Sequence, residues 1–290
     1  MQFIRNCLTI DVEDYFQVNA FAARINRNQW QSFPLRVDRN TGRILDILDA
    51  HGIKATFFVL GWVAERLPAL VREIHGRGHE IACHGFWHEL IFQIGPDKFR
   101  EDIRRAKNLL EDQIGQRVNG YRAPSYSITN RSLWALTILA EEGFTYDSSI
   151  FPIFHDTYGI PEAKRFPHII ETDAGSLHEF PLTTLSLKLG GRTIHLPIAG
   201  GGYLRLLPAG VIRRGIASIN EKERQPAVLY VHPWEIDPDQ PRIKAGMKSR
   251  FRHYLNLRGT EKKLRYLFTE LSFAPMNVFF SQSGATCAKN

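Results

Sequence analysis

At residues 3–14 the chain reads FIRNCLTIDVED, an apolar and β-branched run that ends in three carboxylates. The apolar part predicts a buried β-strand over Phe3–Ile10. Because side chains alternate across a strand, Asp11 and Glu13 project on the same side, and Asp14 follows them. Carboxylates this close repel one another, so we expect a positive partner beside them. The alternative is a solvated turn or a set of acids that cap a helix.

Outward from this strand, further apolar strands alternate with helices. The predicted strands are Lys54–Leu60, Glu80–Cys83, Val118–Tyr121, Phe144–Tyr146 and Ala227–Val231. The predicted helices are Thr41–His51, Trp62–Arg77, Pro96–Ile114, Asn130–Glu142, Pro208–Asn220 and Thr260–Leu271. Pro68 predicts a kink or break in the second of these helices. The alternation is typical of an α/β fold with a parallel sheet, open or closed into a barrel.

The middle of the chain, residues 154–207, breaks that alternation with four prolines and several short β-type runs. We interpret it as a β-rich insertion before the last barrel strands. Residues 236–290 are then a C-terminal extension of a single domain that spans 1–290. A chain of 290 residues buries a large core and needs no disulfide staples.

The composition excludes several classes of protein. The chain is 43% hydrophobic without 18 consecutive apolar residues, so we expect no transmembrane segment. Three cysteines without a CxxC pair predict neither a disulfide framework nor a thiolate metal site. The N-terminus has no apolar run typical of a signal peptide, so we expect a reducing, cytoplasmic location.

The charge is moderately basic, with 37 Lys and Arg against 30 Asp and Glu and a net charge of +7. Part of the excess lies in residues 244–258. No zinc-finger or RNP motif accompanies it, so we expect no nucleic-acid partner. The plain interpretation is a solvated basic face, and the alternative is peripheral contact with an anionic membrane or an acidic polymer.

Two histidines, His84 and His88, lie four residues apart in HGFWH, directly after a predicted strand. Neutral imidazoles suit Zn²⁺, and one carboxylate from the first strand would complete a His₂-carboxylate site with open positions. A second carboxylate beside it could take a proton from metal-bound water. The alternative is two unrelated histidines, which HxxxH alone does not exclude.

Another motif follows the Val118–Tyr121 strand, where residues 121–126 read YRAPSY. The Arg122 guanidinium at this position could orient a catalytic carboxylate and hold it ionised. Pro124 fixes the backbone, which could aim the Ser125 amide at a developing oxyanion. An ordinary loop would also contain such a sequence.

The last motif, LYVHPWE at residues 229–235, places His232 at the end of an apolar strand. A lone histidine there is usually structural, but it follows the strand-end histidine pair, which makes a catalytic acid the sharper hypothesis. We expect Asp147, at the end of Phe144–Tyr146, to pair with His232 and raise its pKa. Five strand ends bearing polar groups are typical of the active face of a β/α barrel.

In this order, the strand-end acids, HGFWH, RAPS, YDSS and LYVH resemble the motifs of NodB-homology polysaccharide deacetylases. The resemblance covers roughly residues 3–235. The stretches TIDVEDYFQV, GGGYLRLLP and HPWEIDP resemble more closely the subgroup encoded with exopolysaccharide and exosortase systems.

The resemblance implies a distorted, seven-stranded (β/α) barrel and a divalent metal, usually zinc. It implies hydrolysis of N-acetyl groups on hexosamine units of an exopolysaccharide or its lipid-linked precursor. The implied roles are general base for Asp11, its partner for Arg122, metal ligands for His84 and His88, oxyanion donor for the Ser125 amide, general acid for His232, and tuning of that acid for Asp147.

The sequence departs from the family pattern in three places. The family usually has two adjacent aspartates, whereas this chain has Asp11, Glu13 and Asp14. The acidic metal ligand is therefore either Glu13 or Asp14. Strand alternation favours Glu13, and the family's preference for Asp favours Asp14. The aromatic residue of the RAPS position is replaced by Ser125, with Tyr126 next. A tryptophan common after YDSS is absent. We therefore expect Ser125 and Tyr126 to line the acetyl pocket differently.

Two other functions remain compatible with the sequence. One is a different amide hydrolase on the same scaffold, such as an imidase acting on a small cyclic amide, because fold does not determine function. The other is a non-catalytic glycan- or lipid-binding protein. The complete set of candidate catalytic residues argues against the second.

Overall fold

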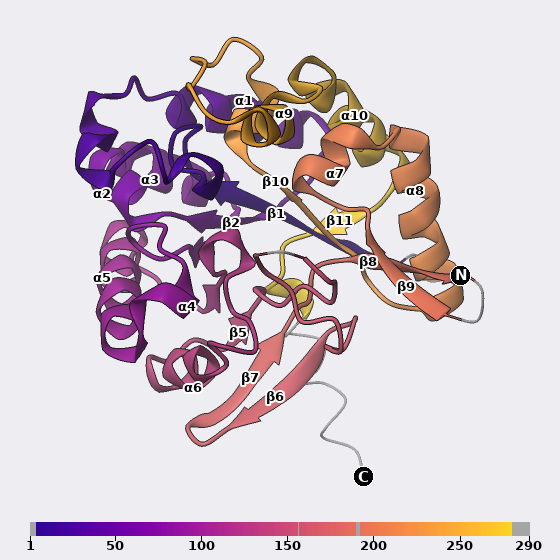
Figure 1. Cartoon of the computed structure of the whole chain (residues 1–290), viewed down its shortest axis with the longest axis horizontal. Helices are drawn as coiled ribbons and strands as arrows, with labels where there is room; N and C mark the ends of the chain where they lie inside the picture. The colour runs from indigo at the N-terminus through magenta and orange to yellow at the C-terminus, as the bar shows by residue number, and fades with distance from the viewer. Residues whose placement is uncertain (1–3, 156, 190–191, 280–290) are drawn as a thin grey trace.

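The computed structural model describes residues 4–155, 157–189 and 192–279. A curved β-sheet runs through the molecule, and most helices pack around its outer side (Figure 1). The strands are β1 (Asn6–Val12), β2 (Thr56–Val59), β3 (Glu80–Cys83), β4 (Gly120–Tyr121), β5 (Tyr146–Asp147), β6 (His168–Thr172), β7 (Gly175–Glu179), β8 (Thr184–Leu189), β9 (Arg192–Pro197), β10 (Val228–Val231) and β11 (Phe273–Ala274).

The helices follow the predicted alternation. They are α1 (Val37–Ala50), α2 (Gly61–Arg66), α3 (Pro68–Gly76), α4 (Ile91–Ile94), α5 (Pro96–Ile114), α6 (Trp134–Glu141), α7 (Gly201–Leu206), α8 (Ala209–Ser218), α9 (Met247–Tyr254) and α10 (Leu257–Glu270). Pro68 begins α3, which confirms the predicted break, because proline is tolerated only in the first turn of a helix. No helix in the described ranges is long and apolar enough to cross a membrane.

The main sheet has the strand order β10-β1-β2-β3-β4-β5-β7-β6, with β11 added beside β1. From β10 to β7 all neighbours pair in parallel, which gives seven parallel strands, and β6 runs antiparallel to β7. The α/β fold with a mostly parallel sheet is therefore confirmed. The register pairs Ile10 with both Phe57 and Val231, so the carboxyl ends of these strands meet at one edge.

Alternate residues of the strands contribute to two different cores. Leu8 and Ile10 face outward and belong to the main core, together with Ile44 of α1. Inward-facing residues form a second apolar cluster inside the curve of the sheet, and it includes Cys7, Phe58, Ala82, Tyr146 and Tyr230 from five different strands. An interior filled by side chains from successive strands is the packing of a small barrel.

The barrel is not closed by a continuous ladder. Within the ranges described, β10 and β7 are the two ends of the parallel series and share no pairing. A side-chain hydrogen bond bridges this gap, because the Val228 amide donates to Thr183 Oγ1 at 2.6 Å. The predicted distorted barrel thus has one open seam, which lies between β7 and β10.

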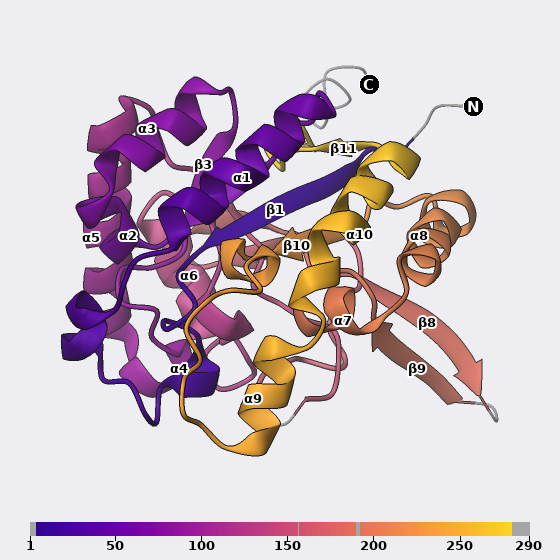
Figure 2. The same ribbon diagram turned by 90° about the horizontal axis from the view of Figure 1, so that it is seen from above.

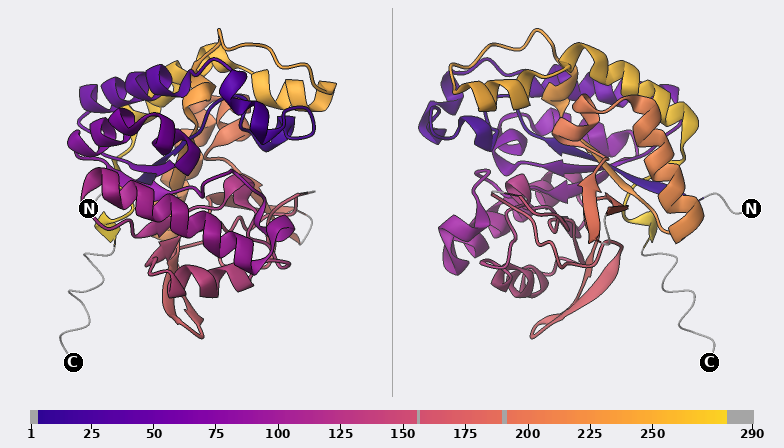
Figure 3. Two further views of the ribbon diagram at one scale, coloured as in Figure 1. Left: turned by 90° about the vertical axis from the view of Figure 1, so that its left-hand side faces the viewer. Right: turned by 45° about the vertical axis from the view of Figure 1, so that its right-hand side comes forward.

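The predicted insertion at 154–207 holds two hairpins of different kinds. The β6–β7 hairpin extends from the body of the molecule (Figures 1 and 3), yet its β7 strand pairs with β5 and is the seventh parallel strand. The β8–β9 hairpin forms a separate two-stranded sheet. In the predicted extension, α10 packs against α7 and α8 (Figure 2), and Phe273 of β11 pairs with Asn6. The division into insertion and extension stays a prediction.

Candidate active site

Polar side chains gather at the carboxyl edge of the parallel strands. Asp11 lies near the end of β1, with Glu13 just beyond it, and His84 follows β3. Arg122 follows β4, and His232 follows β10. All of them except His232 are almost fully buried. The fold therefore brings together residues that are up to 221 positions apart.

Glu13, His84 and His88 form a cluster with the geometry of a metal site. Their ligand atoms all lie within 4.8 Å of one another. His88 Nε2 lies 2.6 Å from Glu13 Oε2. His84 Nδ1 lies 2.8 Å from the carbonyl oxygen of Arg122, which leaves Nε2 of that ring for a metal. A second ring nitrogen held by a carbonyl is the usual arrangement around a metal-binding histidine.

The loop that carries both histidines is held by Asp102 of α5. The amides of Phe86 and Trp87 donate to the Asp102 carboxylate at 2.7 and 3.1 Å. Gly85 has a φ of +71°, and a Cβ there would lie 2.8 Å from Asp102 Oδ2. Only glycine fits this approach, because it has no Cβ and accepts a positive φ. Asp102 and Gly85 together turn the chain so that His84 and His88 face each other.

The electrostatics suit a divalent cation. Burial lowers the pKa of His84 to about 4, so its imidazole is neutral and available as a ligand at neutral pH. Burial alone would raise the pKa of Glu13, but His88, His232 and His84 hold it well below its usual range. The Trp234 indole donates to Glu13 Oε1 at 3.2 Å and fixes this carboxylate. Two imidazoles and one carboxylate fit Zn²⁺ or a similar divalent ion.

Asp14, the alternative ligand, lies elsewhere. Its Oδ2 accepts the amides of Arg36 and Val37 at 2.7 and 3.0 Å, at the start of α1. These are amides that no residue within the helix can satisfy, and a carboxylate is favourable there. The structure thus places Glu13 in the cluster, whereas Asp14 caps a helix. Helix capping was the alternative interpretation of these acids in the sequence analysis.

Asp11 and Arg122 form a buried ion pair, as predicted. Arg122 Nη1 lies 2.7 Å from Asp11 Oδ1 and donates to Thr9 Oγ1 at the same distance. Its remaining nitrogens donate to Ser148, and the guanidinium lies 4.2 Å from the Phe58 ring centroid. A guanidinium held on every side orients the carboxylate of Asp11 toward the cluster.

His232 faces the same cluster from β10. Its Nε2 lies 3.7 Å from Asp11 Oδ2 and 3.7 Å from Glu13 Oε1. Its side chain is 16% exposed, against 2% for Asp11 and 3% for Glu13, so solvent reaches the site at His232. The ring also stacks on Trp234, with centroids 5.2 Å apart.

The partner of His232 is Glu235, which the sequence analysis missed. Glu235 Oε2 lies 3.3 Å from His232 Nδ1, and Glu235 Oε1 accepts a 2.8 Å bond from the buried Arg205 of α7. Burial opposes the charge on His232, but Glu235, Glu13 and Asp11 outweigh it and raise its pKa to about 9. The signal was in the sequence, because Arg205 and Glu235 lie in the quoted GGGYLRLLP and HPWEIDP stretches.

Asp147 was expected to pair with His232 and instead pairs with Glu179 of β7. Its carboxylate accepts the Ser149 hydroxyl at 2.6 Å, and a side-chain hydrogen bond joins it to Glu179. Burial raises the pKa of Asp147 to about 6 and that of Glu179 well above its ordinary value. The Ser149 hydroxyl in turn accepts the Ala123 amide at 2.8 Å, so Asp147 supports the loop beside Arg122.

Ser125 and Tyr126 follow Arg122 with unusual backbone angles. Their φ values are +53° and +54°, and residues with a side chain rarely adopt this region outside functional loops. The Tyr126 ring packs against Tyr230, with centroids 5.1 Å apart. The predicted oxyanion role of the Ser125 amide stays a prediction.

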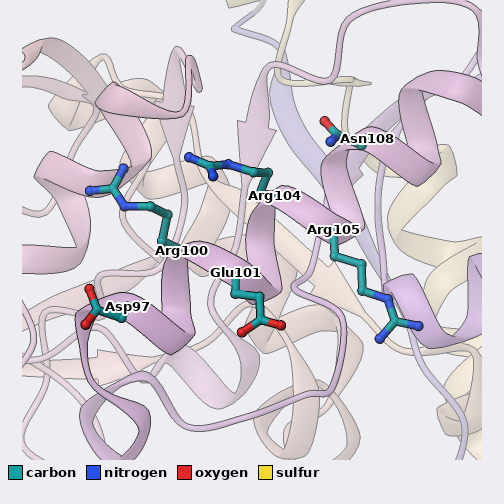
Figure 4. A pocket seen from close by; sticks show the side chains of 6 residues that line it. All are labelled: Asp97, Arg100, Glu101, Arg104, Arg105 and Asn108. Atoms are coloured by element: carbon teal, nitrogen blue, oxygen red, sulfur yellow. The ribbon is translucent and has the colours of Figure 1, made fainter.

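Two cavities lie near or outside the site. One of about 440 Å³ is lined by the segment from Phe16 to Trp30 and reaches His88. The other, of about 400 Å³, lies along one stripe of α5 and contains none of the site residues (Figure 4). Its Arg100 and Arg104 pair with Glu142.

A parallel α/β barrel with a buried His–His–carboxylate cluster, a clamped aspartate and a paired histidine is an arrangement typical of metal-dependent hydrolases. Residues 30–146 match the family model described as polysaccharide deacetylase. Residues 148–281 match a domain of unknown function, DUF3473. The first half of the chain is therefore similar to polysaccharide deacetylases, and the second half is similar to DUF3473.

Curated proteins show the same similarity. The chain is 34% identical over 151 residues to a peptidoglycan deacetylase-like protein of Gibberella zeae, covering 51% of this chain and 38% of that protein. It is 35% identical over 96 residues to a peptidoglycan-N-acetylglucosamine deacetylase of Bacillus cereus, covering 33% of this chain and 35% of that protein. The chain thus spans little more than a third of the length of these curated relatives.

The fold resembles a solved structure along its whole length. A putative polysaccharide deacetylase from Mycobacterium smegmatis superposes with a TM-score of 0.64 at 24% identity, covering 100% of this chain and 94% of that chain. The site draws on every part of the chain. Asp11 and Glu13 precede the matched deacetylase segment, while His232, Glu235 and Arg205 lie within DUF3473.

Proposed function

We propose that the chain is a metal-dependent hydrolase that removes N-acetyl groups from N-acetylhexosamine units of a polysaccharide. One observation carries the proposal. An aspartate clamped by a buried arginine and a histidine paired with a buried glutamate approach each other to 3.7 Å, beside the Glu13–His84–His88 cluster. A base and an acid at one point are what amide hydrolysis requires.

Asp11 is the proposed general base. Arg122 occupies its Oδ1, which leaves Oδ2 on the side of the cluster to accept the proton of an attacking water. A bound divalent ion, held by Glu13, His84 and His88, would polarise the acetamide carbonyl and acidify that water. The main-chain amide of Ser125 is the proposed donor to the developing oxyanion.

His232 is the proposed general acid. Its raised pKa, about 9, keeps the imidazole protonated at neutral pH, and its Nε2 faces Asp11. An amine leaves an acyl carbon poorly unless it is protonated, so this proton transfer completes the cleavage. Glu235 holds the ring by Nδ1, and Arg205 holds Glu235.

For the substrate, we propose an exopolysaccharide or its lipid-linked precursor, with zinc as the metal. This finer assignment rests on the resemblance of the 9–18, 200–208 and 232–238 stretches to the exosortase-associated subgroup. The Bacillus cereus relative is named as a peptidoglycan-N-acetylglucosamine deacetylase, which supports only the N-acetylhexosamine unit. A cytoplasmic location is also proposed and is tested by fractionation of the source cells.

The test is release of acetate from a panel of N-acetylated oligosaccharides, measured with and without a chelator. We expect acetate release that the chelator abolishes and that added Zn²⁺ restores. Ring opening of a cyclic imide without acetate release would instead indicate the imidase-like alternative. Glycan binding without turnover, in protein with no bound metal, would indicate a non-catalytic binding protein.

A further inference from the structure

Helix α9 has one face that packs on the protein and one that does not. His253 is 3% exposed and stacks on Trp234, with ring centroids 4.1 Å apart. On the other side, Met247 is 87% exposed and Phe251 is 64% exposed. Residues four apart share one stripe of a helix, so these two large apolar side chains form a ridge that faces solvent.

The surroundings of this ridge are uniformly basic. Between residues 240 and 260 the chain contains Arg242, Lys244, Lys248, Arg250, Arg252 and Arg258, and no Asp or Glu. Lys248 and Arg252 are also four apart, so they form the stripe beside the ridge. The next acid, Glu261, already contacts Arg43 and Arg265. The sequence of this segment thus concentrates basic residues without acidic ones.

We propose that α9 and its flanking basic residues, 242–258, bind the surface of an anionic lipid bilayer. Basic residues are attracted to anionic headgroups, and an exposed apolar ridge enters the boundary between headgroups and acyl chains. A soluble polyanion would use the same charges but has no use for Met247 and Phe251. The combination of ridge and charge is what favours a membrane over an acidic polymer.

The position of α9 links this surface to the candidate site. Trp234 lies between His253 of α9 and the candidate acid His232, and stacks on both. Phe21 packs against His253 of this helix, with ring centroids 4.7 Å apart, and the helix lies at the edge of the molecule in Figure 2. A bilayer bound by α9 would therefore lie close to the catalytic groups. Membrane binding itself does not depend on the proposed reaction.

The experiment is co-sedimentation of the whole protein with vesicles of phosphatidylcholine alone and with one third phosphatidylglycerol. We expect binding to the anionic vesicles at least tenfold tighter than to phosphatidylcholine, since each basic residue near the surface contributes about fivefold. Arg250→Glu with Arg252→Glu should weaken this binding at least tenfold. Met247→Ser with Phe251→Ser should weaken it severalfold and make the residual binding more sensitive to salt.

Matched controls separate the surface from general effects of charge and polarity. Arg72→Glu with Arg117→Glu makes the same charge change at exposed residues elsewhere, and Leu133→Ser with Val211→Ser removes two other exposed apolar side chains. Both controls should bind as the wild type does. If the wild type does not bind anionic vesicles, that measurement alone overturns the proposal.

Two further results would also overturn it. One is control variants that lose as much binding as the α9 variants. The other is a wild type and a Met247→Ser, Phe251→Ser variant that bind anionic vesicles equally well and also bind soluble polyglutamate equally well. That result would identify a site for acidic polymers. Acetate release is measured separately, so a failure of membrane binding leaves the proposed reaction untouched.

Discussion

His232 lies between two sets of carboxylates, and each ring nitrogen faces one set. Nε2 faces Asp11 and Glu13 at 3.7 Å, and Nδ1 faces Glu235 at 3.3 Å. Asp11 faces Arg122 on one oxygen and the cluster on the other. The two candidate proton carriers are therefore oriented by different partners, which makes their roles separable by mutation.

The first prediction separates acid from base. Asp11→Asn should keep metal and lose ~10²–10⁴-fold in turnover on N-acetyl substrates and on an activated acetyl ester, because both need water attack. His232→Ala should lose a similar factor on the amide and far less on the ester, whose leaving group needs no proton. Measuring both variants on both substrates checks this, and equal losses for His232→Ala would contradict the acid role.

The second prediction separates the two carboxylates proposed to tune that acid. Glu235→Gln should lower kcat about tenfold on the amide and less on the activated ester, since the ring loses its charged partner at Nδ1. Asp147→Asn should not show this dependence on the leaving group, because Asp147 bonds Ser149 and Glu179. The reverse result would return the tuning role to Asp147.

The sequence predicts the members of this site better than their pairing. Asp11 with Arg122, and Glu13 with His84 and His88, follow from strand ends that meet at one sheet edge. The pairing of Glu235 with His232 depends on the short helical turn Pro233–Ile236, which brings together two residues three positions apart. The Asp147 partner depends on β7 joining β5, which no local pattern in the sequence reveals.

At the scale of elements, the acid-rich stretch after β1 serves two structures. Glu13 extends the inward alternation of β1 into the cluster, while Asp14 turns away and caps α1. The bounds predicted for β3 and α5 agree with the structure, because apolar pattern, Pro96 and Gly115 mark them locally. The clamp from Asp102 on the histidine loop was not predictable, because it depends on how α5 packs against β3.

The third prediction concerns the acidic ligand. Glu13→Gln should lose bound metal and activity together, as should His84→Ala. Asp14→Asn should keep stoichiometric metal, and Asp14→Ala should keep metal while the free energy of unfolding falls by about 1 kcal/mol, the usual loss for a missing helix cap. Elemental analysis and thermal unfolding of the four variants check this. Metal loss in Asp14→Asn, with full occupancy in Glu13→Gln, would reverse the assignment.

At the scale of the whole molecule, one sheet unites the two matched segments. Strands β2 to β5 lie largely in the deacetylase match, and β7 and β10 lie in DUF3473. The α/β class was predictable from alternating strands and helices. The role of β7 was not, because its mostly exposed, polar sequence GSLHE lacks the apolar character of a central strand, and only Leu177 and Glu179 in it are buried.

The fourth prediction concerns stability against pH. Burial raises the pKa of Asp147 to about 6 and that of Glu179 further, so the folded chain binds more protons than the unfolded chain from about pH 4 upward. Stability from this pair is therefore greatest at low pH and falls as pH rises through the raised pKa values. Glu179→Gln removes one buried charge and keeps a hydrogen-bonding side chain.

The Tm of Glu179→Gln, relative to wild type, should thus increase between pH 4 and pH 8. Thermal unfolding of both proteins at matched ionic strength and metal content measures the difference. Titrating groups outside this pair are common to both proteins and cancel, and the loss of the Glu179 charge also relieves Asp147. A difference in Tm that is constant across this range, or that shrinks as pH rises, would contradict the prediction.

The position of β1 has a consequence for biosynthesis. β1 is synthesised well before β10 and β11, with which it pairs, and the seam against β7 is bridged by a residue of β10. A nascent chain that has emerged as far as residue 226 holds Glu13, His84 and His88 but has an unpaired β1 edge and no His232. Pairing between strands so far apart in sequence is slow, so this edge stays exposed until β10 and β11 have been synthesised. A chain that lacks β10 also lacks His232, so it has the candidate metal ligands without the candidate acid.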